Sequence, residues 1–284
     1  MMTRQHGFTL VELIVVMVLI GVLGGIFALQ LGPAIQSYLL VGQRAGLTNQ
    51  ADTALRRLVG EVRAAVPNSV RPLSSQCIEM VPSRDGGRYR SGPDTQNDTP
   101  AAPSAFLETD VAKTQFDVLT PFAAAPAQGD RIVIGNQNPD DVYGGVNVET
   151  VQAVEPTAAH MGAHRITLQA PMRIPPGYEG GRFVVVPGQE QAVTYACDKV
   201  GTDPATGTGT GTLYRFARTL PAAAQCTLPA NAAVLADKVS ACSFLYEPNQ
   251  GATQEAGFVQ ARLTITERGE SASLVLGAHV DNVP

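Results

Sequence analysis

The chain contains no tryptophan, few other aromatic residues and little charge. Aromatic residues make up 6% of its 284 residues and charged residues 16%, and the net charge of −5 is spread along the chain without a run of one sign. No basic patch with interleaved aromatic residues occurs, so the composition gives no support for nucleic-acid binding. The scarcity of aromatic rings likewise argues against carbohydrate recognition by stacking.

Sequence motifs of catalysis and cofactor binding are also missing. There is no G-x-S-x-G nucleophile motif and no C-x-x-C pair. The alternating glycines and threonines at 207–211 lack the lysine of a phosphate-binding loop and precede a predicted strand instead of a helix. We therefore predict a protein that is not an enzyme and uses no cofactor.

Two pairs of residues deserve a test as metal ligands. His160 and His164 stand four apart, which would place both on one face of a helix, but the segment runs directly into a predicted strand and no third ligand is adjacent. We expect a surface loop there. Asp140 and Asp141 lie in a loop flanked by proline and glycine, and they form a candidate calcium site with a solvated turn as the alternative.

One long apolar run is present, and it lies at the N-terminus. It follows a short leader, residues 1–7, and extends over residues 8–31 with only three polar side chains, those of Thr9, Glu12 and Gln30. As a helix it would span about 36 Å, enough to cross a bilayer. The run is too long for an ordinary secretory signal and lacks an A-x-A-like cleavage site, which leaves a plain membrane anchor as the simple alternative.

A glutamate inside such a run needs an explanation. A charged side chain at the centre of a membrane helix costs roughly 2.5–3.5 kcal/mol. A partner for the Glu12 carboxylate would offset that cost. Arg4 precedes the apolar run, and the positive-inside rule therefore places the N-terminus in the cytoplasm and the rest of the chain outside.

Residues 7–13, Gly-Phe-Thr-Leu-Val-Glu-Leu, resemble the processing motif of the type IV pilin and pseudopilin family. The resemblance implies cleavage after Gly7 by a prepilin peptidase, N-methylation of Phe8, and pairing of Glu12 with the terminal amine of a neighbouring subunit. It also implies a single-pass protein of the bacterial inner membrane with a periplasmic head, which later enters a pilus or pseudopilus. The implied partners are other minor and major pilin subunits and the inner-membrane assembly platform.

The four cysteines fit a compartment outside the cytoplasm. An even number of scattered cysteines suggests two disulfides there, with three possible connectivities and free buried thiols as the alternative. Because Cys197 and Cys226 flank a predicted strand at 213–216, we expect them to pair with each other, which leaves Cys77 to pair with Cys242.

The periodicity predicts one long helix followed by a β-rich head. We expect a transmembrane helix at 8–32 and an amphipathic continuation at 33–66, because apolar residues recur there at three- and four-residue spacings until Pro67. Any bend or local melting of the helix should lie at Gly24-Gly25, Gly32 or Pro33.

The head, residues 67–284, has no βαβ rhythm, so we predict an α+β protein in which an antiparallel sheet packs against the amphipathic part of the helix. Three stretches look like loops: 85–104, 135–145 and the glycine-rich 201–211, which we expect to be a mobile hairpin tip. Strands are predicted at 77–81, 130–134, 147–154, 165–168, 182–186, 192–197, 211–216, 238–246, 258–267 and 271–280.

Patches of the head resemble the large minor pilins within that family. Residues 193–195, 213–215 and 239–246 are similar to the J-type minor pseudopilin of type II secretion and the W-type minor pilin of type IV pili. Residues 87–90 and 279–284 resemble the O protein of MSHA (mannose-sensitive haemagglutinin) pilus biogenesis. These resemblances imply a minor subunit that helps to initiate a pilus, with a J-type pseudopilin as the first alternative and a tip adhesin as the second.

Overall fold

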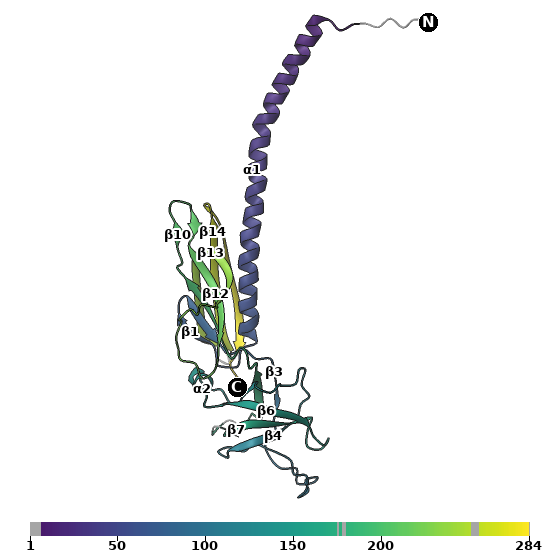
Figure 1. Cartoon of the computed structure of the whole chain (residues 1–284), viewed down its shortest axis with the longest axis vertical. Helices are drawn as coiled ribbons and strands as arrows, with labels where there is room; N and C mark the ends of the chain where they lie inside the picture. The colour runs from purple at the N-terminus through teal and green to yellow at the C-terminus, as the bar shows by residue number, and fades with distance from the viewer. Residues whose placement is uncertain (1–6, 175, 178–179, 251–255, 284) are drawn as a thin grey trace, which may run out of the picture. The chain divides into compact units, whose positions relative to one another are not determined.

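The computed structural model describes residues 7–174, 176–177, 180–250 and 256–283, and the chain forms two compact units that meet between Leu47 and Thr48 (Figure 1). Most of the second unit is antiparallel β-structure, as predicted. In chain order the elements are α1 (Leu10–Arg63), β1 (Arg71–Ser74), β2 (Cys77–Met80), β3 (Asp85–Arg88), β4 (Lys113–Val118), β5 (Arg131–Val133), α2 (Pro139–Gly144), β6 (Val148–Pro156), β7 (His164–Met172), β8 (Arg182–Val186), β9 (Ala192–Asp198), β10 (Thr202–Asp203), β11 (Thr208–Gly209), β12 (Gly211–Arg218), β13 (Ala233–Gln250), β14 (Ala256–Glu267) and β15 (Glu270–Asp281).

Helix α1 is continuous from Leu10 to Arg63 and includes Pro33 in its interior. The helix shows no local melting at Gly24-Gly25, Gly32 or Pro33. The helix ends a few residues before the expected boundary, because Ala65 already forms a β-bridge with Pro82. The backbone N–H of Val66 then donates to the Val81 carbonyl at 2.8 Å, which ties the end of the helix to the head.

A seven-stranded antiparallel sheet in the order β1-β2-β9-β12-β13-β14-β15 packs against the last turns of α1. The helix buries a stripe of small and branched apolar side chains at three- and four-residue spacings. Polar contacts also join the helix to the sheet, among them Glu61 with Arg215 on β12 at 3.0 Å and Gln50 with Asp237 on β13 at 2.8 Å. The buried stripe consists of Ala51, Ala54, Leu55, Leu58 and Val62.

A second sheet of six strands, in the order β3-β8-β5-β6-β7-β4, closes on itself. The residues that follow β3 return to β4, where Tyr89 forms a bridge with Val118 and the Leu119 N–H donates to the Arg88 carbonyl at 2.8 Å. A ring of backbone hydrogen bonds therefore surrounds the interior, which makes this sheet a small barrel. The barrel is filled by a cluster of buried apolar side chains: Tyr89, Leu107, Phe116, Val118, Ile132, Ile134, Val151, Ile166, Leu168, Met172, Ile174, Phe183 and Val185.

The barrel is inserted into the seven-stranded sheet between two neighbouring strands. The chain leaves that sheet after β2 and returns to it at β9, and β2 and β9 pair directly through residues 77–80 and 193–196. A separate apolar cluster joins the two sheets, because it combines Val66 after α1 with Val133 of β5, Val186 of β8 and Ala192 of β9. The sheet and the barrel therefore belong to one compact unit.

All ten predicted strands are present, but two of the three predicted loops contain regular structure that was not expected: strand β3 lies within 85–104 and helix α2 within 135–145. The hairpin expected within 201–211 is present as the short pair β10–β11. The tip of that hairpin is docked by backbone contacts instead of standing free, since the Gly269 N–H donates to the Gly207 carbonyl at 2.9 Å. Strands β1 and β4 were not predicted.

Candidate functional site: the N-terminal motif

Gly7 and Phe8 form an exposed, non-helical segment directly before α1. The Phe8 side chain is 85% exposed, and a Cβ atom added to Gly7 would meet nothing within 4 Å. Gly7 also does not belong to the glycines with positive φ. Nothing in the local structure thus requires glycine at this position. Residues 1–6, which include Arg4, lie outside the described residues.

Thr9 and Glu12 cap the helix reciprocally. The Glu12 N–H donates to Thr9 Oγ1 at 3.3 Å, while the Thr9 N–H and hydroxyl donate to Glu12 Oε2 at 3.3 and 3.2 Å. This arrangement is a capping box, in which a threonine and a glutamate three residues later satisfy backbone N–H groups that the helix leaves free. The carboxylate is also favoured by the positive end of the helix dipole.

The capping box gives Glu12 a role within its own chain that the sequence reasoning missed. Its signal was present, because T-x-x-E before an apolar run is a known signature of a helix start. A carboxylate has about four acceptor sites, so the bonds from Thr9 leave capacity for a further cation. Capping and subunit pairing are therefore compatible roles for this residue.

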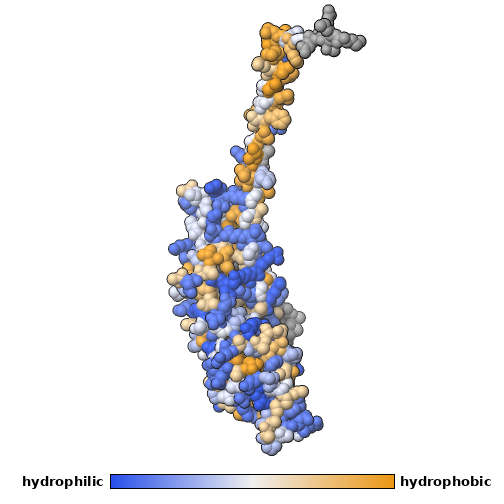
Figure 2. Space-filling model, turned by 45° about the vertical axis from the view of Figure 1, so that its right-hand side comes forward, coloured by the Kyte–Doolittle hydropathy of each residue, from blue (hydrophilic) through white to orange (hydrophobic). Residues whose placement is uncertain are grey.

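The apolar part of α1 that follows the motif is exposed along its whole length. The large apolar side chains from Leu10 to Val41 are each at least 41% exposed, and Figure 2 shows them as an almost continuous apolar surface. By length and composition this helix is suited to cross a membrane, and among the described residues it is the single helix of this kind. A surface of this size in water would be a liability, so an apolar environment must cover it.

The family model of the prokaryotic N-terminal methylation motif matches residues 2–28 of the chain. The matched segment includes Gly7, Phe8, the capping box and the first turns of α1. The comparisons with curated proteins and with solved structures gave no match to this chain. The motif indicates a type IV pilin-like precursor that is a substrate of prepilin peptidase. Together with the apolar helix it indicates anchoring in a membrane, and the family defined by this motif is structural.

The four cysteines form two disulfides, but the expected pairing is wrong. The bonds join Cys77 to Cys226 and Cys197 to Cys242. The reason lies in the pleat of the sheet. Cys77 is directly opposite Ala196 in the β2–β9 register, so Cys197, the next residue, points to the other face. Each cysteine pairs with a partner on its own face of the sheet, whatever the distance along the sequence.

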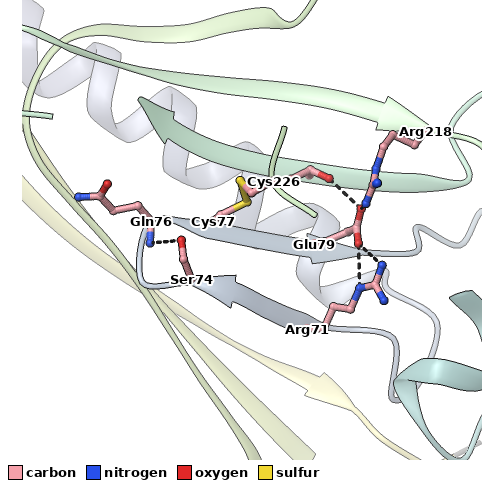
Figure 3. Close-up of a disulfide and its surroundings, with 8 residues drawn as sticks. Arg71, Ser74, Gln76, Cys77, Glu79, Arg218 and Cys226 are labelled. Carbon is pink, nitrogen blue, oxygen red and sulfur yellow. Dashed lines mark hydrogen bonds and ion pairs between the residues drawn. A yellow bond between two sulfur atoms is a disulfide. The ribbon is translucent and has the colours of Figure 1, made fainter. Parts of the chain in front are cut away.

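A buried carboxylate lies two residues from Cys77, on the same face (Figure 3). Glu79 is fully buried and accepts hydrogen bonds from Arg71 Nε and Nη2 at 2.8 and 2.6 Å, from the Thr194 hydroxyl at 2.9 Å, and from Arg218. Arg71 also donates to the Ala222 carbonyl at 2.9 Å in the segment that carries Cys226. The cluster and the disulfide together fix the β12–β13 connection over the sheet, which is a structural role.

Neither candidate metal pair is arranged as a metal site. The Asp141 carboxylate accepts from the Asn138 N–H at 3.0 Å and caps α2, and Asp140 lies in the first turn of the same helix. His160 lies in a turn and His164 begins β7, so they do not share a helix face. Within the part of the chain that the structure describes, no group of three or more His, Cys, Asp or Glu side chains could hold a metal ion.

Proposed function

We propose that this chain is a minor pilin that is cut between Gly7 and Phe8 and then takes part in initiating a type IV pilus of the MSHA type. The observation that carries the proposal is the methylation motif placed directly before an exposed apolar helix, with a large β-rich head after it. A major subunit must repeat along a thin fibre, whereas a bulky head suits a subunit that is present in few copies. On this proposal the protein has no enzymatic activity.

The proposed location is the inner membrane of a bacterium, with the N-terminus in the cytoplasm and the head in the periplasm. Arg4 before the apolar helix supports this orientation. The two disulfides support it independently, since disulfides persist in the periplasm and are rare in the cytosol. The proposed partners are the prepilin peptidase, other minor and major subunits, and the assembly platform of the inner membrane.

Mass analysis of the N-terminus tests the proposed processing. The membrane-derived protein should begin with N-methyl-Phe8. Gly7→Leu should leave the precursor uncut, because the peptidase needs a small residue there, and Gly7→Ala should still be cut. A Cβ atom added to Gly7 meets nothing within 4 Å, and Gly7 is exposed before α1, so we expect both variants to fold. Detection of uncut wild-type protein alone, in cells with active peptidase, would exclude this part of the proposal.

Two substitutions at Glu12 separate helix capping from subunit pairing. Glutamine at the third helical position can also complete a capping box, so Glu12→Gln removes the charge and keeps the cap, whereas Glu12→Val removes both. If the charge pairs with the terminal amine of a neighbouring subunit, both variants should be inserted and cut but fail to enter the minor-subunit complex. Normal incorporation of Glu12→Gln together with failure of Glu12→Val would show that capping alone explains the residue.

Deletion of the gene tests the alternative assignment, in which the chain is a pseudopilin of a type II secretion system. Under the proposal, the deletion strain loses surface pili and retains secretion of its exported enzymes. The reverse phenotype would assign the chain to the secretion machine, with the same processing and the same role of Glu12.

A further inference from the structure

A cavity of about 320 Å³ lies where the barrel meets the end of the seven-stranded sheet. The apolar floor of the cavity consists of the buried side chains of Val66 and Val133 and the half-buried side chain of Val184. Its volume falls in the lower part of the range for small-molecule sites in proteins, about 300–1,000 Å³.

Two arginines stand at the rim of this cavity, and their arrangement is unusual. Arg88 on β3 and Arg182 on β8 are directly opposite each other in the strand register, and both are exposed and line the cavity. Like charges at opposite positions of an antiparallel pair are destabilising. Nevertheless, within the described residues neither guanidinium forms a hydrogen bond or an ion pair.

In the same unit, other arginines have their positive charge neutralised by a neighbouring carboxylate. Six of them form ion pairs with carboxylates at 3.0 Å or less: Arg56, Arg71, Arg84, Arg165, Arg215 and Arg218. Among the described residues, one carboxylate lines the cavity, that of Asp281; it accepts the Val283 N–H at 3.0 Å and forms no ion pair with another described residue. The rim therefore carries an excess of positive charge above an apolar floor.

We propose that this cavity binds a small organic carboxylate. The carboxylate group lies between Arg88 and Arg182, and the apolar body of the ligand occupies the floor. Guanidinium groups form strong charge-assisted hydrogen bonds with carboxylates, and an anion between the two arginines removes their mutual repulsion. The site is independent of the N-terminal motif, so its test does not depend on whether the chain is a pilin.

Binding of 3-phenylpropionate to the full-length protein in a nonionic detergent tests the proposal by titration calorimetry, with protein-free micelles as the blank. We expect saturable binding, and binding at least about tenfold weaker in the double variant R88Q/R182Q, because the charge-assisted bonds are lost. The matched control is R262Q, which removes an exposed arginine on β14 outside the cavity. It should bind like the wild type, and an unchanged thermal midpoint establishes that each variant is folded.

Two further probes separate the contributions of charge and apolar floor. The neutral alcohol 3-phenylpropanol tests the need for the carboxylate, and inorganic phosphate tests the need for the apolar body. Each should bind at least about tenfold more weakly than 3-phenylpropionate. The proposal is overturned if wild-type protein does not bind 3-phenylpropionate, if R88Q/R182Q binds it as tightly as the wild type, or if phosphate or the alcohol binds equally well.

Discussion

Replacement of Glu79 by glutamine should strongly destabilise the head. The change keeps the size and one acceptor oxygen of the side chain but removes the charge that faces Arg71 and Arg218. Both guanidinium groups lie largely inside the protein, so the variant leaves two cations near each other without a counter-ion. Removal of one partner from a buried ion pair costs about 3–5 kcal/mol.

That cost is large enough to measure as a shift of the thermal midpoint. For a unit of this size, 1 kcal/mol corresponds to a shift of about 2–4 °C, so Glu79→Gln should lower the midpoint by about 6–20 °C. The assay is thermal unfolding followed by circular dichroism, on the full-length protein in detergent with both disulfides intact. The matched control is Asp52→Asn, which breaks the exposed pair between Asp52 and Arg56 on α1 and should leave the midpoint unchanged. A midpoint of Glu79→Gln equal to that of the wild type would refute the assignment of this cluster as the element that holds the β12–β13 connection.

Three more outcomes follow from single features of the head. Non-reducing peptide mapping should recover both disulfides in the observed pairing, and the loops of 149 and 45 residues that they close correspond to about 5 and about 4 kcal/mol of stability in the chain-entropy model. The hydrogen bonds from Arg215 lower the pKa of Glu190 below its ordinary value of 4.5, so the stabilisation from this pair is present above that value and is lost as the pH falls through the lowered pKa. Acid titration of the thermal midpoint should therefore show a smaller fall for Glu190→Gln than for the wild type, and equal falls would contradict this. Gly209→Ala should cost about 1–3 kcal/mol in urea unfolding, because the new Cβ would meet the Lys238 carbonyl oxygen, whereas Gly60→Ala, in an open stretch of helix, should stabilise the protein slightly.

The main features of the fold could be predicted because they depend on local patterns. The alternation of 259–266 indicated a half-buried strand, and that segment is part of β14. Strand β3 was read as a loop because its sequence, Asp-Gly-Gly-Arg, is typical of a turn. Its glycines serve close packing instead, since a Cβ on Gly86 would lie 2.8 Å from the Phe183 carbonyl oxygen.

Features that depend on the spatial order of the strands could not be predicted. Closure of the barrel depends on the bridge between Tyr89 and Val118. These residues are far apart in the sequence, and no local sequence pattern predicts their pairing. The disulfide pairing likewise depends on which face of the sheet Cys197 occupies, and that is set by its register with β2. The N-terminal motif was readable because its residues act over a single helical turn. The capping role of Glu12 was not predicted, because the pairing of this residue with the terminal amine of a neighbouring subunit already explained its presence.

The position of the barrel between β2 and β9 means that the barrel segment can be gained or lost without rearrangement of the seven-stranded sheet. Because these strands are hydrogen-bonded neighbours, a short turn from Met80 to Ala192 would preserve every other strand pairing of the seven-stranded sheet and both disulfides. The barrel is therefore an exchangeable module, whose gain or loss leaves the helix-bearing framework intact, apart from the apolar junction around Val133 and Val186. The cavity at that junction would vanish with the module, so any ligand recognised there is a property that the insertion brought with it.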